Sequence, residues 1–202
     1  MKERNKNFIL IILGILFIAF GTLAIINIFI NGVIDSIFWI CYFSVFIIGI
    51  GVLIKNGELI LSQLNILTIF LLIWIGDFFY ILVTGNQGLG VTNFFKVSGT
   101  LSTIISLQHF FVLPLAFFAL YLVKYKQKDT WKISIIEMTF IFIFLQIFGS
   151  KITNVNCVFR SCSNLLQNID PVTHIIYWFI IVFSGILLTN YIINKIKIFQ
   201  KK

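Results

Sequence analysis

The chain has 202 residues, of which 59% are hydrophobic and only 11% are charged, and its mean hydropathy is +1.05. These values exclude a soluble globular domain and indicate an integral membrane protein. The net charge of +8 does not indicate nucleic-acid binding, because the basic residues form short clusters beside apolar segments rather than a patch with stacking aromatic residues.

Six apolar segments are long enough to cross a bilayer, which takes roughly 20 residues. The sequence therefore predicts an all-α, polytopic integral membrane protein with a single six-helix transmembrane domain over residues 1–202. In chain order the predicted spans cover about 8–31, 34–54, 59–84, 101–123, 132–150 and 171–194. Gly14 and Gly21 lie on one face of the first span and predict the close approach of a neighbouring helix.

Basic residues gather at one set of span ends: the N-terminus, residue 55, residues 124–132 and the C-terminus. The opposite ends carry only Lys96, Lys151 and Arg160. The excess of Lys and Arg on cytoplasmic loops predicts a multi-pass protein of the cell membrane with both termini in the cytoplasm. The two long connections, 85–100 and 151–170, are then outer loops.

Four polar side chains from four different spans fall at a similar depth. Asp77 in span three and His109 in span four lie roughly 10 and 12 Å below the outer boundary, at 1.5 Å per residue. Gln146 and His174 lie near the outer ends of spans five and six. Because polar groups inside a membrane are costly, this layer predicts a polar pocket open to the outer leaflet. Pro114 is expected to kink span four or to free a carbonyl beneath it.

The leading functional hypothesis is a membrane-embedded enzyme that acts on a lipid, an isoprenoid or a lipid-linked group. In it His109 is a general base or metal ligand, Asp77 orients His109, and His174 is a second base or ligand. The alternative for Asp77 and His109 is an interhelical hydrogen bond that holds the bundle together. Arg160 is the expected contact for a phosphate or carboxylate. Four further polar residues are expected substrate contacts: Ser106, Tyr80, Gln146 and Asn156.

His109, His174 and Asp77 are also suitable ligands for a zinc or iron ion with one position left for water. A haem held by the two histidines is the weaker alternative.

Cys157 and Cys162 lie in the second outer loop, where oxidation to a disulfide is expected. A nucleophilic thiol with His174 as its base and Arg160 beside it is one alternative. Disulfide exchange is another, although the spacing is not C-x-x-C and no second cysteine pair exists to relay electrons.

Two further functions remain open. The protein could be a small-solute binding or transport subunit, but the inner half offers only Ser62, Asn65, Thr68 and Glu137 as polar groups. Glu137 is itself expected at the cytoplasmic interface, paired with a lysine. Otherwise the protein is a structural or assembly protein whose polar residues serve packing alone. The expected partners are the lipid bilayer and a hydrophobic or lipid-linked small molecule, and no nucleic acid.

Overall fold

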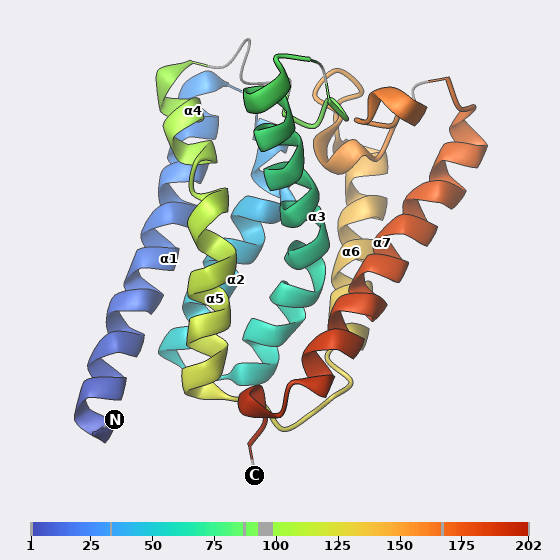
Figure 1. Cartoon of the computed structure of the whole chain (residues 1–202). Coiled ribbons are helices and arrows are strands. Elements are labelled where there is room, and N and C mark those ends of the chain that lie inside the picture. The colour runs from blue at the N-terminus through green and yellow to red at the C-terminus, as the bar shows by residue number, and fades with distance from the viewer. Residues whose placement is uncertain (1, 33, 87, 93–98, 167, 202) are drawn as a thin grey trace.

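The computed structural model describes residues 2–32, 34–86, 88–92, 99–166 and 168–201 and shows a bundle of helices (Figure 1). No β-strand occurs in these residues. The helices are α1 (Glu3–Asn31), α2 (Ile40–Leu53), α3 (Gly57–Thr84), α4 (Thr100–Ser106), α5 (His109–Val123), α6 (Trp131–Phe148) and α7 (Pro171–Lys195). Short 3₁₀ turns accompany them in the described part of the chain, at Ile34–Phe38, Val155–Cys157, Asn164–Leu166 and Lys197–Phe199.

Five helical stretches are long and apolar enough to cross a membrane, and they coincide with five of the six predicted spans. They are α1, α3, α6, α7 and the 24-residue stretch formed by α4 and α5 together. The remaining span, predicted over 34–54, is divided into the turn Ile34–Phe38 and the 14-residue helix α2. At 1.5 Å per residue α2 is about 21 Å long, which is shorter than the roughly 30 Å hydrocarbon core.

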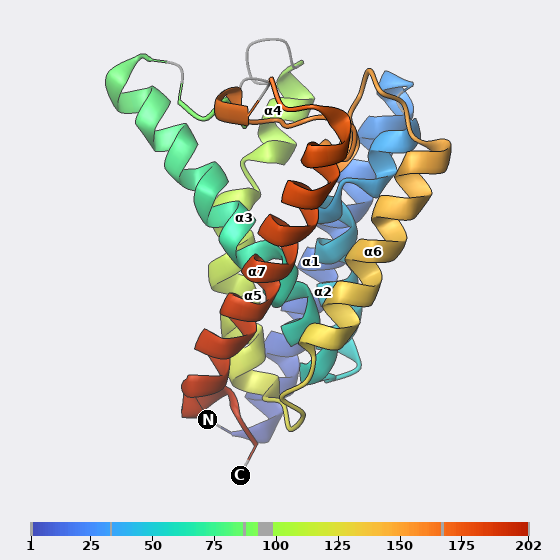
Figure 2. The same ribbon diagram turned by 90° about the vertical axis from the view of Figure 1, so that its right-hand side faces the viewer.

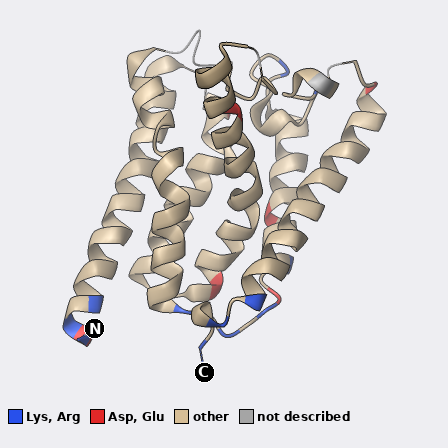
Figure 3. Ribbon diagram, in the orientation of Figure 1, with Lys and Arg blue, Asp and Glu red and all other residues tan. Residues whose placement is uncertain are grey.

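The two ends of the bundle differ in charge and in loop length. Both termini lie at one end, here called the terminal end, and Lys and Arg gather there (Figure 3). The long connections after α3 and α6 lie at the opposite end, here called the loop end (Figure 1). The assignment of the terminal end to the cytoplasm stays a prediction from the charge asymmetry.

Helix α3 is the centre of the bundle, since it packs against α2, α5, α6 and α7. One apolar core joins α1, α2, α3 and α5, and a second joins α3, α6 and α7 with Val155 and Val158 of the loop after α6. Large apolar side chains are exposed on the outward helix faces, as expected for contact with lipid. Helices α3 and α6 diverge towards the loop end (Figure 2).

The prediction from Gly14 and Gly21 is confirmed, and the neighbouring helix is α2. A Cβ atom added at Gly14 would lie 2.5 Å from Cδ2 of Leu53, and one at Gly21 would lie 3.0 Å from Cβ of Phe46. Side chains at these positions would therefore push α1 away from α2.

Glu137 does not pair with a lysine. Its Oε2 accepts a hydrogen bond from Nε2 of Gln63 at 2.7 Å, which links α6 to α3 inside the bundle. Lys132 forms its ion pair with Asp129 instead, at 2.8 Å. Among the described residues, the expected pairing of Glu137 with a lysine is therefore wrong.

The half of the bundle near the terminal end is more polar than the sequence suggested. Asn65 of α3 donates to Thr130 and to Asn190 of α7, and Asn190 donates to the carbonyl of Lys128. Ser134 of α6 donates to the carbonyl of Ser62 at 2.8 Å. Hydrogen bonds of this kind hold helices together where no water is available.

Candidate functional site

A cavity of about 430 Å³ lies towards the loop end of the bundle. Its wall comes from the start of α2, from α3, α5, α6 and α7, and from both long loops. Most of the wall is apolar and much of it aromatic, with Trp39, Phe70, Trp74, Tyr177 and Trp178. Pockets of this size and character hold small apolar ligands. Sequence reasoning missed the contribution of α2 and the aromatic wall, because neither carries a polar signal.

The carboxylate of Asp77 is hydrogen-bonded to the loop that follows its own helix. The side chain is only 3% exposed, and it accepts hydrogen bonds from the backbone N–H of Leu89, from the N–H of Thr92 at 3.0 Å and from the Thr92 hydroxyl at 2.8 Å. Gly88 leaves the room for this contact, because a Cβ there would lie 2.2 Å from Oδ1 of Asp77. Asp77 therefore ties the loop to α3.

The expected pairing of Asp77 with His109 is not found. The hydrogen bonds of both side chains go to other groups, and among the described residues no cluster of three His, Cys, Asp or Glu side chains could hold a metal ion. The predicted zinc ligand set of Asp77, His109 and His174 is thus not assembled. The backbone N–H groups of Leu89 and Thr92 need acceptors, and the Asp77 carboxylate supplies them.

His109 is positioned by an interruption between α4 and α5. The N–H of Phe110 bonds to the carbonyl of Leu107, three residues back, so that the carbonyl of Ser106 lacks its usual helical partner. Nδ1 of His109 takes this carbonyl as its own partner, and the imidazole packs on Trp74 with 4.7 Å between ring centroids. The interruption lies on the loop-end side of His109, whereas the kink expected from Pro114 lay beneath it.

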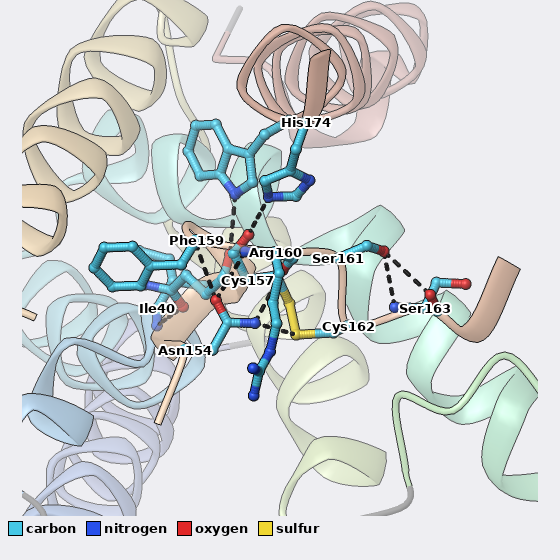
Figure 4. The surroundings of a disulfide bond; sticks show 11 residues. Ile40, Asn154, Cys157, Phe159, Arg160, Ser161, Cys162, Ser163 and His174 are labelled. Atoms are coloured by element: carbon cyan, nitrogen blue, oxygen red, sulfur yellow. Dashed lines mark hydrogen bonds between the residues drawn. A yellow bond between two sulfur atoms is a disulfide. The ribbon is translucent and has the colours of Figure 1, made fainter. Parts of the chain in front are cut away.

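His174 lies in the first turn of α7. Asp170 caps this helix by accepting from the N–H groups of Val172 and Thr173, and Pro171 occupies the first helical position. Nε2 of His174 lies 2.9 Å from the carbonyl oxygen of Cys157 (Figure 4).

The two imidazoles share a hydrogen-bonding pattern. A carbonyl oxygen only accepts, so Nδ1 of His109 and Nε2 of His174 each carry the hydrogen. The other ring nitrogen of each then carries a lone pair that accepts no hydrogen bond from the described residues, and both histidines belong to the wall of the cavity. In general, a hydrogen bond of this kind at one ring nitrogen fixes the tautomer and the orientation of the imidazole.

The loop beside His174 contains three non-glycine residues with left-handed backbone. The φ angles of Asn154, Asn156 and Cys157 are 47°, 52° and 58°. Asparagine adopts this conformation readily, whereas for Cys157 it costs of order 1–3 kcal/mol, and such strained positions cluster at functional sites. The surrounding contacts hold this strained backbone in place.

Asn154 and Asn156 provide those contacts. Oδ1 of Asn154 accepts from the N–H of Phe159 at 3.0 Å, and its Nδ2 donates to the carbonyl of Arg160 at 2.9 Å (Figure 4). The side chain of Asn156 bonds to the N–H of Ile40 at 3.0 Å and to the carbonyl of Phe38 at 2.6 Å, which joins the loop to the start of α2. Asn156 thus connects the loop to α2 and also belongs to the wall of the cavity.

Cys157 and Cys162 lie at disulfide-bond distance, as predicted. Both cysteines belong to the wall of the cavity. The disulfide is therefore part of the same site as the two histidines.

The other predicted contacts lie elsewhere. The Ser106 hydroxyl donates to the carbonyl of Ser102, and Tyr80 is 49% exposed outside the cavity wall. Gln146 donates to the carbonyl of Val158 at 2.8 Å, and Arg160 is exposed on the loop.

No protein-family model matches the chain, and the comparisons with curated proteins and with solved structures give no match either. The chemistry of the cavity residues is thus the basis for a functional proposal.

Proposed function

We propose that this protein is a multi-pass enzyme of the cell membrane that binds a lipid, an isoprenoid or a lipid-linked group in the cavity. His109 and His174 act as acid–base residues on the polar part of that molecule. The Lys and Arg residues at the terminal end support an orientation in which the loop end, and with it the cavity, faces the outer leaflet.

The pattern shared by the two imidazoles carries this proposal. Each has one nitrogen anchored to a backbone carbonyl and the other available as a base, and both line one apolar cavity. A positioned imidazole contributes roughly 10²–10⁴-fold to a reaction that moves a proton. The exposed Arg160, on the loop that lines the cavity, suits contact with a phosphate or carboxylate headgroup.

The apolar wall supports the choice of substrate class. Trp74, Trp178 and Phe70 offer flat surfaces to a hydrocarbon or ring system, whereas a small polar solute would meet few partners. The second candidate, a solute-binding or transport subunit, has one observation in its favour, which is the hydrogen-bonded polar network near the terminal end.

The test separates binding from chemistry. Purified protein is analysed by native mass spectrometry for retained amphiphiles and is then incubated with lipid extract, whose composition is followed by liquid chromatography and mass spectrometry. Val182→Phe places a larger side chain in the cavity and is expected to abolish retention of the amphiphile. His109→Gln and His174→Gln are expected to keep retention and to lower turnover about a hundredfold.

Tyr80→Phe, at a side chain outside the cavity wall, is the matched control and is expected to behave as the wild-type protein. The proposal is wrong if folded wild-type protein retains no amphiphile, or if both histidine variants leave the lipid composition as the wild type does. Solute movement across vesicles that Glu137→Ala abolishes would instead establish the transport candidate.

A further inference from the structure

The disulfide between Cys157 and Cys162 lines the cavity, and this placement bears on its chemistry. A disulfide with a purely structural role can lie anywhere in a loop. Here both cysteines belong to the wall of the cavity, together with Ser161 and Ser163. The two cysteines are partly exposed. A molecule in the cavity would therefore lie beside both cysteines.

The groups around the sulfur atoms suit thiol chemistry. Nδ2 of Asn154 donates to Sγ of Cys162 at 3.7 Å, and such a bond stabilises a thiolate. Arg160 stands between the two cysteines in the sequence and adds a positive charge to this loop (Figure 4). Nε2 of His174 is bound to the carbonyl of Cys157, which places this imidazole of α7 beside the loop as a candidate base.

The backbone at this position is strained as well. Cys157 itself has a φ of 58°, and Asn154 and Asn156 are also left-handed. Backbone strain of this kind accompanies active sites more often than inert loops.

We propose that Cys157 and Cys162 are a redox-active pair that transfers two electrons from an external dithiol to an isoprenoid quinone in the cavity. This inference rests on the proposed function, because it names the isoprenoid class that the cavity holds. A quinone combines a flat ring, which aromatic walls accommodate, with an apolar tail and two carbonyl oxygens that accept protons.

The electrons and protons balance as follows. A thiolate of the external dithiol attacks the disulfide, which forms a mixed disulfide and releases one of the two cysteines as a thiolate. The second external thiolate then attacks the external sulfur of the mixed disulfide and releases the other cysteine. Cys157 and Cys162 are now reduced, and the external pair is oxidised. The Cys162 thiolate then adds to a ring carbon of the quinone, and the electron pair moves to a quinone oxygen, which takes one proton.

His174 removes the thiol proton of Cys157. The resulting thiolate attacks Sγ of Cys162, the S–S bond forms, and the C–S bond breaks with its electron pair left on the ring. The second proton completes the hydroquinone. Two thiols and one quinone thus give one disulfide and one hydroquinone.

This placement removes the main objection to redox chemistry that the sequence raised. A second cysteine pair is needed only when the acceptor is distant from the first pair. Here the wall that holds the acceptor contains the disulfide itself, so the electrons need no relay.

The test is a single turnover without oxygen. All proteins carry Cys41→Ala, because Cys41 is the one remaining cysteine of the three in the chain. The protein in nanodiscs is reduced with dithiothreitol, separated from it, and mixed with decylubiquinone. Loss of thiols is counted with dithiodipyridine, and hydroquinone is measured by its absorbance.

We expect one hydroquinone for each pair of thiols lost, and none with Cys157→Ser/Cys162→Ser. His174→Gln keeps a donor for the Cys157 carbonyl and removes the base, so it is expected to slow reoxidation about a hundredfold. Diamide oxidises thiols without binding in the cavity, so the rate at which it oxidises the His174→Gln variant is expected to stay within about twofold of the rate for the protein that retains His174. This control distinguishes the loss of a base from a disordered loop.

The inference is overturned if diamide restores the disulfide whereas decylubiquinone leaves the thiols reduced. It is equally overturned if His174→Gln is reoxidised by the quinone at the rate of the parent protein. Native mass spectrometry then separates the two proposals. A cavity that retains amphiphiles in a redox-inert protein leaves the proposed function standing, whereas an empty cavity removes both.

Discussion

The imidazole of His174 and the carbonyl of Cys157 are hydrogen-bonded at 2.9 Å, which joins the first turn of α7 to the disulfide loop. A candidate base and a candidate redox sulfur thereby belong to one rigid unit. The carbonyl depends on the imidazole for its partner, and this dependence can be measured.

His174→Leu is expected to lower the free energy of unfolding by about 1–3 kcal/mol, because it leaves a carbonyl without a partner near the cavity. His174→Gln retains a side-chain N–H and is expected to cost less. Thermal unfolding in detergent, followed by tryptophan fluorescence, checks the order of the two variants. Equal stability of both would show that the bond to Cys157 does not hold the loop.

Asp77→Asn is expected to loosen the loop that follows α3. The carboxylate accepts three hydrogen bonds from Leu89 and Thr92, and an amide can offer only one acceptor oxygen to them. A loss of about 1–3 kcal/mol is expected, with faster hydrogen exchange at the amide groups of Leu89 and Thr92.

Gly88→Ala tests the same contact from the other side, since its Cβ would lie 2.2 Å from Oδ1 of Asp77. The double variant with Asp77→Asn is expected to cost clearly less than the two single losses added, because both substitutions break one contact. Additive losses would contradict a shared contact. A catalytic role for Asp77 would appear instead as lost turnover with unchanged exchange.

Asn156→Ala and Asn156→Gly form a matched pair. Both remove the bonds to Ile40 and Phe38, but glycine adopts a φ of 52° without strain and alanine does not. Alanine is therefore expected to be the less stable by about 1–2 kcal/mol, as measured by thermal unfolding. If glycine were the worse substitution, the backbone at Asn156 would not be left-handed.

Gln63→Leu is expected to destabilise the protein more than Glu137→Gln. The leucine leaves the partly buried carboxyl group of Glu137 without its hydrogen-bond partner on α3, at a cost of about 1–3 kcal/mol. Glu137→Gln keeps an acceptor for Nε2 of Gln63. Unfolding measurements on both variants and on the double variant give the coupling, and the reverse order would show that the carboxylate finds another partner.

The cap of α7 predicts a pH dependence. Hydrogen bonds from the Thr173 hydroxyl, the Thr173 N–H and the Val172 N–H hold the pKa of Asp170 below its ordinary value. A carboxyl with a lowered pKa in the folded state stabilises the protein above its unfolded pKa, and this stabilisation is lost as the pH falls through the folded value.

Asp170→Asn is therefore expected to be less stable than the wild-type protein near neutral pH, and the difference is expected to shrink below about pH 4, where the wild-type carboxyl takes up its proton. Thermal unfolding midpoints across that range measure it. A difference that stays constant with pH would show that the cap acts without its charge.

The sequence by itself determined the helical class, five spans and the charge asymmetry between the two ends. Apolar length and the clustering of Lys and Arg are one-dimensional properties, so they need no knowledge of the fold. The predicted start of the last span at about residue 171 coincides with the start of α7, and the two cysteines of the loop were correctly paired.

Only the tertiary structure decided which polar groups meet. The rise of 1.5 Å per residue predicts how deep Asp77 and His109 lie, but their partners depend on helix rotation and on the path of the loops. Asp77 accepts hydrogen bonds from the backbone of the loop after α3, and His109 donates to the carbonyl of Ser106, which has no helical partner. The disulfide reached the cavity wall because Asn154 and Asn156 bend the backbone back between α2 and α7, a conformation that long-range contacts impose.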